Sequence, residues 1–186
     1  NSYKDIKTRK VKFVGSPDQR IKEDYLRILR FFRFHARYGK GAPDAAGFAA
    51  CKRLRKGMAQ LSAERVRQEV LKLLAAPRAV ATLKAMAKSG ILGEIIPYTD
   101  EWRVIERIGP DPVLRLAVLA KDPAALKNKL RLANGEANRI ASAIDAPVLT
   151  PALRPAEQRR ILFDVGASAW HDAVLVSWAR SRASMS

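Results

Sequence analysis

Residues 20–38 read RIKEDYLRILRFFRFHARY. Apolar side chains recur along it at the spacing of an α-helix, which predicts one buried face. These are Ile21, Tyr25, Ile28, Leu29, Phe32 and Ala36, whereas Arg20, Glu23, Asp24, Arg27, Arg30 and Arg37 lie mostly on the other face. Arginine presents planar forks of donors that suit phosphates and base edges.

Two helix-start signals divide this region. Ser16 can cap a helix, Pro17 suits its first position, and Gln19 stands where a capping box requires it. Asp24 is a second start signal. We therefore expect a short helical turn around Pro17 to Lys22 and a long helix from about Asp24 to Tyr38, which the Gly- and Pro-containing segment 39–44 ends.

The rest of the sequence reads as further helices separated by Pro and Gly, which predicts an all-α, irregular multi-helix bundle. A short segment, Val11 to Val14, is the only strand candidate, and Ile91 to Pro97 reads as a packed apolar linker. The expected helices are 44–56, a third one capped by Ser62, a fourth one opened by Pro77 and ended by Gly90, and then 101–108, 112–119, 123–132, 136–144, 155–165 and 167–180.

Composition narrows the range of functions. The formal net charge is +17, which favours a nucleic-acid partner, with a ribosomal or merely basic protein as the alternative. Cys51 is the only cysteine and there are two histidines, so no disulfide within the chain and no Cys-cluster or His-cluster metal site is expected. No apolar run approaches the ~20 residues of a membrane helix, and we expect a cytoplasmic protein.

Two ordered motifs carry a family resemblance. They are KFVGSP at 12–17 followed by RIxEDxLRILRFxRF at 20–34, and LSxERxxxE at 61–69. Together they resemble the neck region of class II tRNA nucleotidyltransferases, which are the CCA-adding enzymes and their relatives, the bacterial poly(A) polymerases. The resemblance implies a linker from a catalytic head domain at 1–16, a nucleotide-selecting, RNA-binding neck at 17–90 and a helical body at 91–186.

By this resemblance, Glu23, Asp24 and Arg27 select the incoming nucleotide, with Asp24 and Arg27 acting together as a template for C or A. The chemistry is reasonable, because a carboxylate accepts from the exocyclic amine that uracil lacks, and a guanidinium donates to ring nitrogens or carbonyls. A mismatched base would leave polar groups unpaired. The alternative is structural: Asp24 caps a helix, and one of the two acids pairs with Arg27.

Further basic residues extend this face. By resemblance, Arg30, Arg33 and Arg37 meet the triphosphate or the RNA 3′ end, although Arg33 falls close to the apolar edge and is equally expected to brace the neck. Arg20 serves the same anion or pairs with Asp24. Glu64 and Arg65 are expected mainly to tie the third helix to the first.

A compact basic cluster follows in the next helix, and clusters of this kind hold phosphates without reading sequence. We expect RNA-backbone contact here, since no carboxylate lies between residues 45 and 63; a solvated face is the alternative. The cluster comprises Lys52, Arg53, Arg55 and Lys56, with Lys72, Arg78, Lys84 and Lys88 further along.

Aromatic side chains stack on bases in some proteins, but at these spacings core packing is the expectation. This applies to Phe31, Phe32, Phe34, Tyr38, Phe48, Trp170 and Trp178. His35 is expected to be a packed or surface histidine, and Cys51 has no neighbouring His to activate it.

Catalysis in this family needs Mg²⁺ held by an Asp-x-Asp in the head domain. The first 100 residues contain no two acidic residues separated by a single residue, so we expect no catalytic or metal-binding residue here. The chain reads as a neck-and-body fragment, inactive alone, that meets ATP or CTP and the 3′ end of tRNA or another RNA. The neck motifs do not distinguish CCA addition from A-tailing, and a standalone RNA-binding module remains an alternative.

Overall fold

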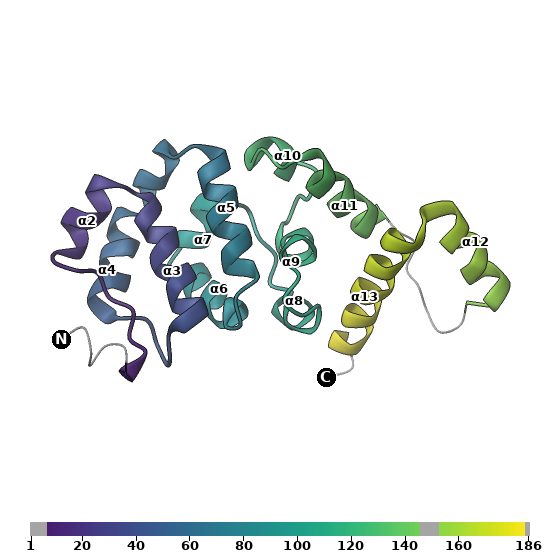
Figure 1. The fold of residues 1–186 in the computed structure, drawn as a ribbon, viewed down its shortest axis with the longest axis horizontal. Coiled ribbons are helices and arrows are strands. Elements are labelled where there is room, and N and C mark those ends of the chain that lie inside the picture. Colours follow the sequence, from purple (N-terminus) through teal and green to yellow (C-terminus); the bar gives the residue numbers. More distant parts are fainter. Residues whose placement is uncertain (1–6, 146–152, 185–186) are drawn as a thin grey trace.

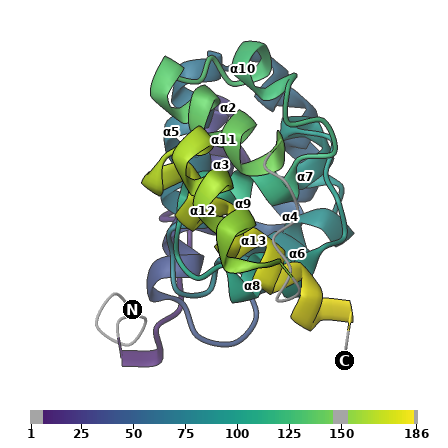
Figure 2. The same cartoon turned by 90° about the vertical axis from the view of Figure 1, so that its right-hand side faces the viewer.

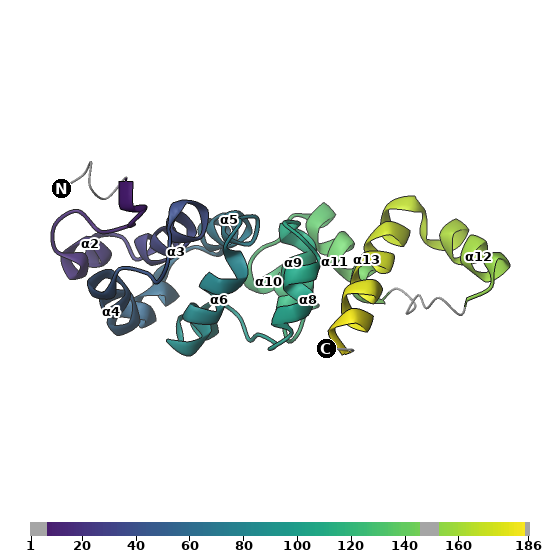
Figure 3. The ribbon, with the colours of Figure 1, turned by 90° about the horizontal axis from the view of Figure 1, so that it is seen from below.

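The computed structural model describes residues 7–145 and 153–184, and helices dominate these residues. Figure 1 shows an elongated arrangement, in which the chain runs from α2 near one end to α12 at the other. Figure 3 shows the same progression from below, and Figure 2 looks along the long axis from the α12 end. The all-α prediction is confirmed.

The first group of helices surrounds α3. It consists of α2 (Pro17–Glu23), α3 (Leu26–Tyr38), α4 (Ala45–Leu54), the 3₁₀ helix η1 (Arg55–Gln60), α5 (Ala63–Leu74), α6 (Ala79–Lys88) and α7 (Ile91–Ile95). Helix α3 packs against α2, α5 and α6, and α2 also packs against α4. The buried face of α3 includes Ile28, Leu29 and Phe32, as the helical spacing predicted.

The second group begins at residue 102. It consists of α8 (Trp102–Arg107), α9 (Pro112–Leu119), α10 (Leu126–Lys129), α11 (Asn134–Asp145), α12 (Pro155–Val165) and α13 (Ala167–Ser184). The predicted limits of α9 and α12 agree with the structure. One hydrophobic core runs through both groups. The division into a neck ending at residue 90 and a body stays a prediction.

A buried arginine connects the two groups. Arg115 on α9 donates from Nη1 to the carbonyl oxygen of Leu74, the last residue of α5, at 2.6 Å, and from Nε to that of Ile105 on α8 at 3.2 Å. Its side chain thereby satisfies carbonyl groups near the ends of two helices that have no partner within their own helix. Burial lowers the pKa of Arg115 from its ordinary value.

Two residues, Asp24 and Tyr25, separate α2 from α3. Ser16 caps α2 by accepting from the backbone N–H of Gln19 at 3.5 Å. Asp24 then takes an extended conformation, with φ −156° and ψ 106°, which ends α2, and its Oδ1 accepts from the Leu26 N–H at 3.1 Å. Asp24 thus caps the new helix. Both predicted helices are confirmed.

Tyr25 fixes this junction against the next helices. Its ring packs on Gly57 of η1 so closely that a Cβ at position 57 would overlap with ring atoms of Tyr25. Only glycine leaves room for the ring at this contact. The contact between the Tyr25 ring and Gly57 therefore holds the α2–α3 junction in place.

Four local predictions were wrong. Val11–Val14 forms no strand: the Phe13 ring instead stacks on Phe31 with centroids 5.2 Å apart, and no strand lies beside it in the described part of the chain. The expected linker at 91–97 contains the short helix α7, because Ile91, Leu92 and Ile95 together fill the core. Ser62 precedes α5 without a capping hydrogen bond from its side chain. Pro77 lies in the turn before α6.

The aromatic predictions divide by position. Phe31 and Phe32 are buried and Phe48 is partly buried, but Phe34 and Tyr38 are 40% and 61% exposed. Trp178 is 47% exposed and Trp170 is partly buried, because α13 turns Ala173, Val176 and Ala179 inward instead. His35 is buried, so it is the packed alternative that the structure shows.

A candidate nucleotide and RNA site at the α2–α3 junction

The extended backbone at Asp24 directs two adjacent acidic residues toward different partners. Glu23 closes the last turn of α2, and its Oε2 accepts from Nη1 of Arg27 and, at 2.6 Å, from Nη1 of Arg20. The hydrogen bond from Arg27 lowers the pKa of Glu23, so the carboxylate stays ionised well below neutral pH. Glu23 is the acid that pairs with Arg27, and Arg20 pairs with Glu23 rather than Asp24.

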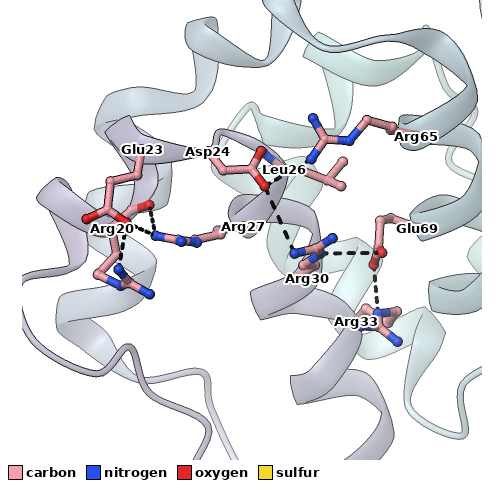
Figure 4. Close-up of polar contacts among 9 residues, drawn as sticks. All are labelled: Arg20, Glu23, Asp24, Leu26, Arg27, Arg30, Arg33, Arg65 and Glu69. Atoms are coloured by element: carbon pink, nitrogen blue, oxygen red, sulfur yellow. Dashed lines mark hydrogen bonds and ion pairs between the residues drawn. The ribbon is translucent and has the colours of Figure 1, made fainter.

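Asp24 belongs to a second group of charges. Its Oδ2 lies 3.0 Å from Nη2 of Arg65 on α5 and 4.0 Å from Nη1 of Arg30 on α3. Figure 4 shows Arg27 extending toward Glu23 and Arg20, while the Asp24 carboxylate faces Leu26, Arg30 and Arg65. Asp24 and Arg27 therefore flank the junction, and each is held by a different neighbour rather than by the other.

Asp24 and Arg27 both keep hydrogen-bonding atoms that are accessible to solvent. The side chains of Asp24 and Arg27 are 23% and 26% exposed. Among the described residues, Arg27 uses only Nη1, which donates to Glu23 and to the carbonyl oxygen of Arg20 at 2.7 Å. A guanidinium has five N–H groups, so those on Nε and Nη2 are available for a ligand. The junction contains two carboxylates and four arginines, which favours an anionic ligand.

Arg33 is oriented by a buried acid. Its Nε lies 2.7 Å from Oε2 of Glu69 on α5, and Arg30 approaches the same carboxylate at 3.7 Å. The Glu69 side chain is only 7% exposed. Of the two roles expected for Arg33, the structure shows the bracing contact. Arg37 lies two turns beyond Arg30 on the exposed side of α3.

The second motif works through contacts made by α5. Arg65 joins α5 to the α2–α3 junction, as expected. Glu64 instead pairs with Arg131, which follows α10, at 3.0 Å. Arg67 donates to the carbonyl oxygen of that same Arg131 and pairs with Glu136 at 3.6 Å. No local sequence pattern indicates these partners, since they lie more than 60 residues away along the chain.

The basic cluster is partly neutralised in the folded chain. Arg53 forms a bidentate pair with Asp18 of α2 at 2.8 and 2.9 Å, and Arg55 lies 3.4 Å from Glu94 of α7. Lys52 and Lys56 are exposed. The local absence of acids was therefore misleading, because the balancing carboxylates come from distant segments. Arg78 is also structural and donates to the carbonyl oxygens of Gly39 and Gly41.

The described residues offer no group of three or more His, Cys, Asp or Glu side chains that fits a metal ion. Among the described helices, none is both long and apolar enough to cross a membrane.

Comparison with known proteins decides the family. A family model described as "Probable RNA and SrmB- binding site of polymerase A" matches residues 44–103. The mitochondrial CCA tRNA nucleotidyltransferase 1 of Danio rerio is 33% identical over 149 residues, which cover 73% of this chain and 35% of the relative. Its Homo sapiens counterpart is 34% identical over 154 residues, covering 74% and 35%. This chain belongs to the class II CCA-adding enzyme family.

Bacterial CCA-adding enzymes are similar as well. That of Bacillus licheniformis is 29% identical over 157 residues, covering 83% of this chain and 39% of the relative. The crystal structure of the Bacillus stearothermophilus CCA-adding enzyme in complex with CTP shares the fold, with a TM-score of 0.78 over 96% of this chain and 48% of that one, at 22% identity. The chain spans about a third of the length of the vertebrate CCA-adding enzymes it matches.

Proposed function

We propose that this chain is the nucleotide-selecting and RNA-binding part of a tRNA CCA-adding nucleotidyltransferase, which extends RNA 3′ ends without a nucleic-acid template. Membership of the family supports this assignment, as does the net charge of +17. The observation that carries it is the extended backbone of Asp24 between α2 and α3, which places the Glu23–Arg27 pair beside the Asp24–Arg65 pair on one partly exposed surface.

The arrangement suits recognition of a base edge. Asp24 Oδ1 accepts one backbone N–H, which leaves a lone pair for the exocyclic amine of cytosine or adenine. Glu23 fixes one end of the Arg27 guanidinium, so its free N–H groups have a defined direction. We propose that the base is held between Asp24 and Arg27, and that each contact contributes about tenfold to discrimination against a base that lacks the partner.

The other basic residues would hold the rest of the ligand. Arg37 is exposed on α3, and Arg30 is partly exposed beside Asp24 and Glu69; both suit the triphosphate or the phosphates of the RNA 3′ end. Lys52 and Lys56 would add sequence-independent contacts to the RNA backbone. Arg20, Arg33, Arg53 and Arg55 are already paired with carboxylates, so we propose that they mainly position the surface.

We expect no nucleotide transfer by these 186 residues alone, because the sequence has no Asp-x-Asp pair to hold the Mg²⁺ that this chemistry uses. The proposal is therefore tested by binding. CTP and ATP should bind saturably to the chain, UTP about tenfold more weakly, and Arg27→Ala should abolish the preference. Arg53→Ala, which removes an exposed arginine on α4, is the matched control. Equal weak binding of all four nucleotides by the wild-type chain and by Arg27→Ala would contradict the proposal.

A second candidate is A-tailing, because the family model for residues 44–103 is named after polymerase A. The same titration separates the two functions. A CCA-adding protein accepts CTP and ATP at the junction, whereas an A-tailing protein prefers ATP over CTP.

A further inference from the structure

The exposed face of α3 continues beyond the junction and ends in two aromatic rings. Residues 27, 30, 34 and 38 follow one another at intervals of three or four, so they lie on one face of the helix. Phe34 and Tyr38 are 40% and 61% exposed. Phe31 shares this face but is buried, and the ring of Phe13 stacks on it, whereas Phe32 points to the core side of the helix. Large apolar rings gain stability from burial, so an exposed pair indicates a binding surface.

The two rings are held in a defined arrangement. They lie nearly parallel, with an interplanar angle of 25° and centroids 6.2 Å apart. The Arg33 guanidinium lies 4.3 Å from the Phe34 ring centroid, and its Nε pairs with Glu69 at 2.7 Å. The Phe34–Tyr38 pair, called the platform below, therefore presents aromatic surface next to a positive charge.

The segment after the platform is also fixed. The Gly39 N–H donates to the His35 carbonyl oxygen, and Arg78 donates to the carbonyl oxygens of Gly39 and Gly41 at 2.6 and 2.7 Å. Tyr38 thus stands at the end of a rigid helix rather than on a loose loop. A base that stacks on it loses little binding energy to ordering of the protein.

Charge around the rings selects the partner. Helix α3 contains four arginines and no acidic residue, and Arg37 is exposed between the two rings in sequence. An apolar protein segment would gain nothing from these charges, whereas a single nucleic-acid strand supplies both phosphates and flat bases. Sites for single strands combine a positive surface with aromatic rings in this way.

The geometry points to a new binding site: we propose that the Phe34–Tyr38 pair stacks an unpaired base of a single RNA strand a few nucleotides before its 3′ end. The position rests on the proposed function, which places the incoming nucleotide at Asp24 and Arg27. Arg27 and Tyr38 are eleven positions apart along the helix, which is a rise of about 16 Å. That distance spans at most about five stacked nucleotides at about 3.4 Å each.

The test is a binding cycle with abasic RNA. A fluorescently labelled 12-nucleotide single strand, with an abasic nucleotide placed in turn at each of the last six positions, is titrated by anisotropy against the 186-residue chain. One abasic position should weaken wild-type binding about tenfold, and Tyr38→Leu should weaken binding of the intact RNA by a similar factor. The two losses should not add, because both remove the same stacking contact.

The controls separate stacking from other effects. Tyr38→Phe should bind like wild type, and so should Phe163→Leu, which changes an 88% exposed ring on α12. The dependence of RNA affinity on salt concentration should have the same slope in Tyr38→Leu as in wild type, since no phosphate contact is lost. Blunt duplex RNA should bind wild type and Tyr38→Leu equally.

Two results would overturn the inference, and they are distinguishable. If wild type binds the single strand and Tyr38→Leu binds it within twofold, the aromatic pair serves a protein contact instead, while RNA binding stands. If wild type binds no RNA at any salt concentration, the proposed function fails together with the stacking site.

Discussion

The carboxylate of Asp24 lies 3.0 Å from the guanidinium of Arg65, although 41 residues separate them in sequence. The contact joins the first family motif to the second and fixes Asp24 Oδ2, while the Leu26 N–H fixes Oδ1. Arg65→Ala should therefore release Asp24 and weaken its preference for an amine-bearing base.

The readout is the ratio of CTP to UTP affinity. We expect that ratio to fall several-fold in Arg65→Ala, while the free energy of unfolding changes by less than about 1 kcal/mol, because Arg65 is half exposed. Arg131→Ala, which breaks the other pair made by this turn of α5, is the control. An unchanged ratio would show that Arg65 does not position Asp24.

Glu69 should be the acid on which stability depends most. Glu69→Ala leaves Arg33 and Arg30 facing one another without a carboxylate, and we expect a loss of about 2–3 kcal/mol in the free energy of unfolding. Urea denaturation of Glu69→Ala and of Glu64→Ala gives the comparison. Glu64 pairs with an arginine that is 71% exposed, so its removal should be close to neutral. Equal losses would contradict the role of burial.

Gly57 should tolerate no side chain. Gly57→Ala places a methyl group against the Tyr25 ring and should cost about 1–3 kcal/mol through overpacking. Gly135→Ala on α11 is the matched control, because nothing lies within 4 Å of its added Cβ. A melting temperature of Gly57→Ala equal to that of the control would mean that the junction is not held by this contact.

Cys51 should be unreactive in the folded chain. Burial raises the pKa of its thiol to about 12, so very little thiolate exists at pH 8. A thiol reagent at that pH should label the chain only after denaturant is added. Rapid labelling of the native chain would show that α4 opens readily.

Acid should weaken the packing of α9, α11 and α13. Asp172 is buried; burial raises its pKa, but hydrogen bonds from Arg139 at 2.6 and 2.9 Å outweigh this, and the net pKa is lowered. The stabilisation is therefore present above about pH 3.9, the unfolded value, and is lost as pH falls through the lower folded value. Asp172→Asn should cost about 2 kcal/mol at pH 7.

The same comparison at pH 2–3 checks the sign. The difference in unfolding free energy between wild type and Asp172→Asn should shrink there, because the wild-type carboxyl becomes protonated. A difference that stays constant with pH would show that the Arg139 pair contributes nothing.

The helices were predictable from sequence because each prediction depended on local signals. Ser16, Pro17 and Asp24 mark the two helix starts, and the apolar spacing in α3 identified its buried face. The prediction of a strand at Val11–Val14 was wrong because strand pairing depends on a partner that is distant in sequence. Phe34 and Tyr38 look like core residues by spacing, and only the packing of α5 and α6 on the other side of α3 shows that they are exposed.

The candidate site was predictable in its residue types but not in its pairing. Helical spacing allowed either acid to pair with Arg27, and the extended Asp24 backbone decides in favour of Glu23. The basic cluster seemed unbalanced because Asp18 and Glu94 lie far from it in sequence. Long-range ion pairs of this kind leave no periodic signal.

Hydrogen–deuterium exchange with and without CTP tests most directly whether the α2–α3 junction binds the nucleotide. The account predicts slower exchange on CTP addition in peptides covering residues 20–34, no change in α12 and α13, and loss of the protection in Arg27→Ala. Protection confined to other helices, or none around Asp24 at a saturating CTP concentration, would contradict it.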